Sequence, residues 1–305
     1  MELALILLNQ VFVMFLLILI GVICLKTKAI SPEANKQMGD IALLVVAPAV
    51  ILRAYQTQYD PALAKGLLIA LALAIVTHIV AIAISLTLKK SDKRDVKPEK
   101  FSIIYANAAF MAIPLITACF GDIGVFYLSA YITVFNLLQW TYGIFLMSDK
   151  KDKQNISKLF LSPAIICICI GLLIFFFKIS LPSPISKAIN FVADMNTPLA
   201  MIATGGFIAQ TNIFKAFTSL RVYFIVFIKL VLLPLICMGI FKLLPVDPTI
   251  STVMLIVSAC PCATSTIFFS SKFGRDTGYA SQLVTLSTLL SIITIPLIVY
   301  IQSLI

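Results

Sequence analysis

Apolar residues run along this chain in continuous stretches of roughly 20 positions, the length that an α-helix needs to cross a bilayer. Short polar segments separate these stretches. The stretches do not alternate between apolar and polar residues, which argues against a transmembrane barrel. The pattern therefore predicts ten helical spans, at about residues 3–25, 31–55, 62–88, 101–120, 123–147, 158–178, 185–209, 221–243, 249–272 and 278–303.

Local signals mark the start of several of these helices. Ser31 is a good N-cap, Pro32 suits the first helical position, and Glu33 places a carboxylate in the first turn. Pro61 and Pro184 open the third and seventh predicted spans in the same way. These signals predict helix starts at about residues 32, 61 and 184.

Two long polar segments, residues 89–100 and 148–158, organise the chain. The second divides it into two halves of five spans, 1–150 and 151–305. Because five is odd, the second half must enter the membrane in the opposite sense to the first. A shift of 150 positions superposes Gly21 on Gly171, Lys28 on Lys178, Pro32 on Pro182 and Pro48 on Pro198. We therefore expect an all-α integral membrane protein of ten transmembrane helices in two inverted five-helix repeats.

Composition and charge agree with this architecture. Hydrophobic residues make up 61% of the chain and charged residues 12%, and the mean hydropathy is +1.07, whereas a soluble domain carries about 25% charged residues. The formal charge of +10 lies mostly in the gaps between spans, which indicates membrane orientation rather than nucleic-acid binding. With the N-terminus outside, 17 of the 23 Lys and Arg residues fall on the inner side. We expect a multi-pass cell-membrane protein with both termini extracytoplasmic.

Prolines interrupt the fourth and ninth predicted spans, Pro114 in one half and Pro261 in the other. A proline within a helix removes a hydrogen bond and clashes with the preceding turn. Beyond each break, a new half-helix would expose backbone N–H groups, which suit a carboxylate. Paired interrupted helices in inverted repeats are typical of secondary transporters. The predicted substrate-binding residues are Pro114, Leu115, Ile116, Pro261, Cys262, Ala263 and Thr264.

A metal-based alternative stays open at this stage. The sequence Cys260-Pro261-Cys262 presents two soft thiols, as a heavy-metal permease or channel would. Against this alternative, His78 is the only histidine, and no ATP-hydrolysing domain is evident. The seven cysteines all fall within apolar stretches, where they are expected to be small buried side chains.

Ionisable residues within membrane spans are functional candidates. We select Asp194 and Lys229 as candidates for ion coupling, with Asp194 as a proton-linked carboxylate neutralised by Lys229. The alternatives are an interfacial position for Asp194, snorkelling for Lys229 and a packing role for His78. No enzyme constellation, cofactor motif or resident metal site is evident, so we expect a non-enzyme without a cofactor, coupled to protons or sodium.

Several motifs resemble those of one family. The sequence Asn107-x-x-Phe-Met-x-Ile-Pro114 resembles the fourth-helix motif of the auxin efflux carrier family, whose bacterial members include malate and malonate permeases. Residues 261–276 and 287–296 are similar to that family's last two helices, and residues 196–205 to its seventh. The chain departs from the family pattern at Ala112, where glycine is usual, and in the cysteines that flank Pro261.

The resemblance implies a function and an arrangement of helices. The first, second, sixth and seventh helices would form a scaffold, and the other six a transport domain whose fourth and ninth helices cross at their prolines. It implies a permease for an organic anion, with Asn107 near the substrate carboxylate. The expected partners are that anion and the lipid bilayer, with a homodimer as a further candidate.

Overall fold

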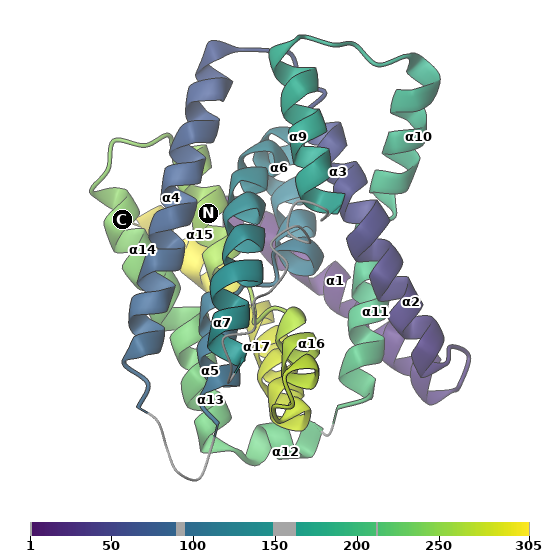
Figure 1. Cartoon of the computed structure of the whole chain (residues 1–305), viewed down its shortest axis with the longest axis vertical. Coiled ribbons are helices and arrows are strands. Elements are labelled where there is room, and N and C mark those ends of the chain that lie inside the picture. Colours follow the sequence, from purple (N-terminus) through teal and green to yellow (C-terminus); the bar gives the residue numbers. More distant parts are fainter. Residues whose placement is uncertain (1, 90–94, 149–162, 212, 305) are drawn as a thin grey trace.

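The computed structural model of the chain describes residues 2–89, 95–148, 163–211 and 213–304, whose regular structure is helical apart from one isolated β-bridge (Figure 1). The first half contains α1 (Glu2–Lys26), α2 (Pro32–Ile41), the π-helix η1 (Ala42–Val46), α3 (Ala47–Ala54), α4 (Pro61–Leu86), α5 (Lys97–Ile104), η2 (Ala108–Ala112), α6 (Ile113–Leu138), η3 (Gln139–Gly143) and α7 (Ile144–Met147). The second half contains α9 (Pro163–Phe176), α10 (Ser183–Asp194), α11 (Asn196–Ala209), α12 (Ile213–Thr218), α13 (Leu220–Phe227), η4 (Ile228–Leu232), α14 (Leu233–Lys242), α15 (Pro248–Ala259), α16 (Ser265–Lys272) and α17 (Thr277–Leu304).

Six of the described helical stretches are long and apolar enough to cross a membrane: 3–26, 32–54, 61–86, 108–147, 220–242 and 277–304. The shorter α9 and α15 are also apolar. The stretch from Ala108 to Met147 has 40 residues, about 60 Å at 1.5 Å per residue, twice the hydrocarbon thickness. Gly121, with φ 58°, interrupts it. The prediction of an all-helical protein with several membrane-spanning helices is confirmed, while most of the polar segment 148–158 lies outside the described residues.

The predicted helix starts are confirmed at their caps. The Ser31 hydroxyl accepts a hydrogen bond from the Ala34 N–H at 3.1 Å, and α2 begins at Pro32. The Asp60 carboxylate caps α4 in the same way, ahead of Pro61. α10 has a proline in its first turn, as expected from Pro184. The predicted seventh span is not one helix, however, because it is divided at Met195 into α10 and α11.

Three of the four π-helices in the described residues end two residues before a proline. η1 is followed by Pro48, η2 by Pro114 and η4 by Pro234, each in the first turn of the next α-helix. Proline cannot donate to the carbonyl four residues earlier and collides with it. A π turn carries one extra residue per turn, which changes the position of that carbonyl. These helices therefore continue through their prolines.

α1 and α11 approach each other backbone to backbone. A Cβ atom built on Gly21 would lie 2.1 Å from the Ile202 carbonyl oxygen, and one on Gly205 would lie 2.0 Å from that of Ile18. Such contacts between small residues let membrane helices pack closely. The buried Asn35 side chain of α2 extends this contact by donating to the Ala203 carbonyl at 3.1 Å. The three helices therefore form one tightly packed unit.

Two positions that the 150-residue shift superposes share an unusual backbone conformation. Lys28 and Lys178 have φ values of 61° and 55°, and they are the two non-glycine residues with positive φ in the described part of the chain. Each lies just after a helix, α1 or α9, where a left-handed residue commonly ends the helix. The two halves therefore use the same local geometry at matching places.

Candidate functional site

The centre of the molecule holds two broken helices that pair with each other. The first break, Tyr105–Asn107, separates α5 from η2, and the second, Cys260–Thr264, separates α15 from α16. The Asn107 N–H donates to the Pro261 carbonyl at 2.8 Å, and the Ala263 N–H donates to the Tyr105 carbonyl at 3.0 Å. Ala106 and Cys262 form an isolated antiparallel bridge. We call these two paired breaks the crossing.

The predicted break at Pro114 is wrong, whereas the predicted break at Pro261 is confirmed. Pro114 lies in the first turn of α6, which continues from η2 without interruption. The actual break lies seven residues earlier, at Asn107, and contains no proline. Pro114, Leu115 and Ile116 are all buried in this continuous helix, about 10 Å along the axis from the crossing. They do not begin a half-helix, so they offer no free N–H groups at the crossing.

Two of the backbone donors predicted after Pro261 already have partners. The Cys262 N–H donates to the Ser287 hydroxyl of α17 at 3.1 Å, and the Ala263 N–H completes the pairing with Tyr105. Thr264, partly buried, precedes the first residue of α16. The N–H groups of Cys262 and Ala263 therefore build the crossing rather than remaining available to a ligand. Ser287 was missed in the sequence because a serine in an apolar helix carries no positional signal.

Asn107 lies at the crossing itself. Its side-chain oxygen accepts from the Phe110 N–H at 3.3 Å, so it caps the helix that begins with η2. The residue is 4% exposed, and its Nδ2 has no hydrogen-bond partner among the described residues. A buried amide donor left unpaired is costly. Asn107 therefore presents an N–H group at a helix N-terminus, inside the protein.

Lys229 lies in η4 and is completely buried. Its ammonium nitrogen has no hydrogen-bond partner in the described part of the chain. It interacts electrostatically with the thiols of Cys260 and Cys262 at the crossing, and with the His78 imidazole of α4. Snorkelling of Lys229 to the aqueous surface is therefore not observed. The structure brings Lys229 close to the crossing, which the sequence spacing did not indicate.

Asp194 lies in a different environment, at the C-terminal end of α10. Its carboxylate pairs with the Arg53 guanidinium at 2.7 Å, and its side chain is 69% exposed. Arg53 also pairs with Asp122, just after Gly121, at 3.0 Å. The expectation that Lys229 neutralises Asp194 is therefore wrong, because Arg53 takes that place.

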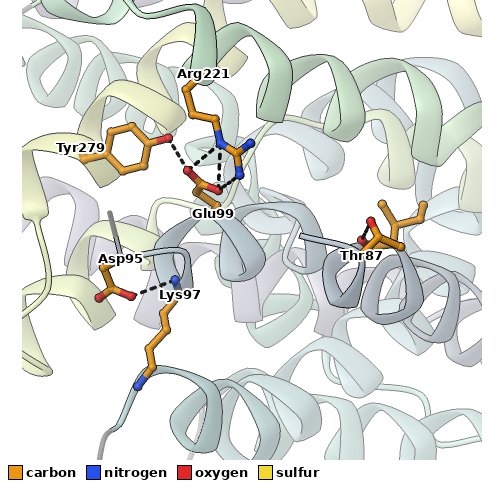
Figure 2. Close-up of polar contacts among 7 residues, drawn as sticks. Thr87, Asp95, Lys97, Glu99, Arg221 and Tyr279 are labelled. Carbon is orange, nitrogen blue, oxygen red and sulfur yellow. Dashed lines mark hydrogen bonds and ion pairs between the residues drawn. The ribbon is translucent and has the colours of Figure 1, made fainter. Parts of the chain in front are cut away.

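A buried carboxylate that the sequence did not single out anchors the start of the first broken helix. Glu99 of α5 is fully buried, and Figure 2 shows it between Arg221 of α13 and Tyr279 of α17. The Arg221 Nε donates to both carboxylate oxygens, at 3.0 and 3.2 Å, and the Tyr279 hydroxyl donates at 2.8 Å. In the sequence, Glu99 falls in the charged segment 89–100, which resembles a solvated loop.

A polar cleft of about 270 Å³ lies between the end of α11 and the start of α17. Gln210 and Thr211 line one side, and Asp276, Tyr279 and Gln282 line the other. Tyr279 therefore lies between this cleft and the buried Glu99. None of the predicted substrate-binding residues is among its lining residues.

The described residues contain no group of three or more His, Cys, Asp or Glu side chains that would hold a metal ion. Cys260 and Cys262 are both fully buried and stand on either side of Pro261. Stable transition-metal sites in proteins use three or four such ligands. The geometry at the crossing therefore does not favour the metal-based alternative.

Comparison with known proteins agrees with the motifs. The family model described as membrane transport protein, which represents the auxin efflux carriers, matches the chain twice, over residues 6–158 and 153–299. A search of curated proteins gave no match. Together, the two matches cover nearly the whole chain. This chain therefore belongs to the auxin efflux carrier family of membrane transport proteins.

Proposed function

We propose that this protein is a secondary transporter that moves a small organic anion, a carboxylate, across the cell membrane by alternating access. The observation that supports the proposal is the unpaired, buried Nδ2 of Asn107 at the crossing. This amide lies where a new helix begins, and helix N-termini attract negative charge. A carboxylate oxygen placed there would accept the unused N–H, whose burial otherwise costs about 1–3 kcal/mol.

The proposed architecture is ten spans in two inverted repeats, 1–150 and 151–305, with both termini extracytoplasmic. The 40-residue stretch from Ala108 to Met147 supports it, because that stretch is long enough for two crossings and is interrupted at Gly121. The matched backbone geometry of Lys28 and Lys178 supports the repeat.

The proposed scaffold consists of the first, second, sixth and seventh spans. Its support is the backbone contact of α1 with α11, which Asn35 of α2 reinforces. The other six spans carry the crossing and would move as the transport domain. A homodimer is a separate part of the proposal.

The test is a thermal-shift screen of small mono- and dicarboxylates against the purified protein and its Asn107→Ala variant. Removing a donor to a charged group should cost about 1.5–3 kcal/mol, or roughly ten- to a hundredfold in affinity. Asn136→Ala is the matched control, because the Asn136 amide donates to Ile132 within its own helix. A carboxylate that stabilises the wild type and Asn107→Ala at the same concentrations would remove Asn107 from the site.

A further inference from the structure

The buried amine of Lys229 has no counter-ion in the described structure. Its side chain is 0% exposed, and its nitrogen has no hydrogen-bond partner. Lysines within membrane spans normally pair with an acid or reach the interface. An ammonium ion that does neither bears the cost of desolvation without the gain of an ion pair. This residue therefore needs either to lose its proton or to meet an anion.

The groups that face Lys229 carry no formal negative charge. They are the thiols of Cys237 on α14 and of Cys260 and Cys262 at the crossing, together with the imidazole of His78 on α4.

The carboxylate on a helix that packs against η4 is already neutralised. α5 and α13, which also pack against η4, carry Glu99 and Arg221, and these two pair with each other. Tyr279 of α17, which also packs against η4, joins that pair. The described neighbours of Lys229 therefore supply no anion of their own.

His78 adds a second basic nitrogen to this environment. Its Nδ1 lies 2.8 Å from the Ala74 carbonyl and must donate to it, because a carbonyl only accepts. In the neutral ring, Nε2 is then an acceptor, and it has no partner among the described residues. The ring packs against Tyr131 with centroids 4.7 Å apart, which fixes its orientation. A free basic nitrogen thus lies in the same buried cluster as Lys229.

The cluster is connected to the crossing through the second break. Lys229 interacts with Cys262, which is bridged to Ala106, the residue before Asn107. An anion at Asn107 would therefore act on Lys229 across a protein interior, where charge interactions are much stronger than in water. Two ligands of opposite charge in such a site favour each other's binding, and the coupling is reciprocal.

We infer that Lys229, with His78 beside it, takes up a proton when the crossing binds its anion and releases that proton on the other side of the membrane. This inference rests on the proposed function and names its coupling ion. The amine nitrogen binds one proton from water on the loading side, and the proton leaves when the anion leaves. A monovalent anion would then cross with no net charge.

The first test counts the protons that the protein takes up when it binds the anion. Calorimetric titration with the small carboxylate selected by the thermal-shift screen is repeated in buffers of different ionisation enthalpy. Wild type should take up about one proton for each anion bound, by linkage between the two sites. Lys229→Arg keeps the charge permanently, so this variant should bind the same carboxylate with no proton uptake.

The second test measures flux of that carboxylate in proteoliposomes. Wild type and the control Lys65→Met, which changes an exposed lysine of α4, should accumulate it when the outside is made acidic. Lys229→Arg should exchange labelled for unlabelled carboxylate but should lose accumulation driven by the pH gradient. Lys229→Met should bind the anion about ten- to a hundredfold more weakly, within the usual range of coupling between sites.

The outcomes separate this inference from the proposed function. Carboxylate flux in wild type that ignores the pH gradient, or proton uptake that survives Lys229→Arg, overturns the inference alone. A wild-type protein that neither binds nor moves any carboxylate overturns the proposed function and the inference with it.

Discussion

Replacing glycine by alanine should destabilise the protein in the contact between α1 and α11 and stabilise it at an uncrowded glycine elsewhere. In Gly205→Ala, the new Cβ would lie 2.0 Å from the Ile18 carbonyl oxygen and 3.0 Å from the Val22 nitrogen. Both are backbone atoms, so no side chain can rotate away and the helices must separate. Gly239 of α14 is the control, because no atom lies within 4 Å of a Cβ built there.

The magnitudes follow from two competing terms. Overpacking costs about 1–3 kcal/mol and sometimes more, whereas replacing glycine by alanine within a helix gains up to about 1 kcal/mol. Gly205→Ala should therefore destabilise the protein by about 1–3 kcal/mol, since separation also weakens the bond from Asn35 to Ala203. Gly239→Ala should stabilise it by up to about 1 kcal/mol.

Thermal unfolding in detergent, followed by intrinsic fluorescence, measures the difference. At about 2–4 °C per kcal/mol, Gly205→Ala should lower Tm by several degrees while Gly239→Ala raises it slightly. Gly21→Ala should resemble Gly205→Ala, and the double variant should be less than additive, because the same contact opens only once. Equal shifts for Gly205→Ala and Gly239→Ala would refute the close approach of the two helices.

Two further predictions concern the buried carboxylate and the orientation. Glu99→Ala should destabilise the protein by about 1–3 kcal/mol, because it removes the partner of Arg221, whose partly exposed guanidinium water can still reach. Tyr279→Phe should cost less than this because it removes one hydrogen bond (Figure 2). Thermal unfolding of both variants checks this ranking, which would be refuted if Tyr279→Phe were the more damaging change. A cysteine introduced within residues 148–158, in a background without reactive native cysteines, should be labelled by an impermeant reagent only after the cells are opened. Labelling of intact cells would reverse the proposed orientation.

The sequence was sufficient to predict the helices but not the position at which the first broken helix is interrupted. Long apolar stretches, the cap at Ser31 and the helix start at Pro61 depend on local chemistry, so the sequence predicted them correctly. Pro114 was misleading because a π turn before it lets the helix continue. The actual break at Tyr105–Asn107 is held by partners from the other half of the chain. No local pattern encodes such a pairing.

The environments of the ionisable residues also could not be predicted from local sequence. Asp194 and Lys229 both stood within predicted spans, and hydropathy alone gave no way to tell an exposed ion pair from an isolated buried amine. The difference arises from tertiary neighbours, Arg53 for Asp194 and the cysteines of the crossing for Lys229. Glu99 was overlooked because its neighbours in sequence are charged, while its neighbours in space are a guanidinium and a phenol.

The pairing at the crossing has a consequence for how the protein is made. Cys262 leaves the ribosome about 150 residues after Ala106, the residue with which it forms the bridge, and synthesis at about 5–20 residues per second makes this a delay of many seconds. Until then, the Asn107 N–H and the Tyr105 carbonyl lack the partners that the second half supplies, and unpaired backbone groups are not tolerated in contact with lipid. The first half must therefore wait near the insertion machinery or in a water-lined intermediate, and its membrane assembly is completed only by the second half.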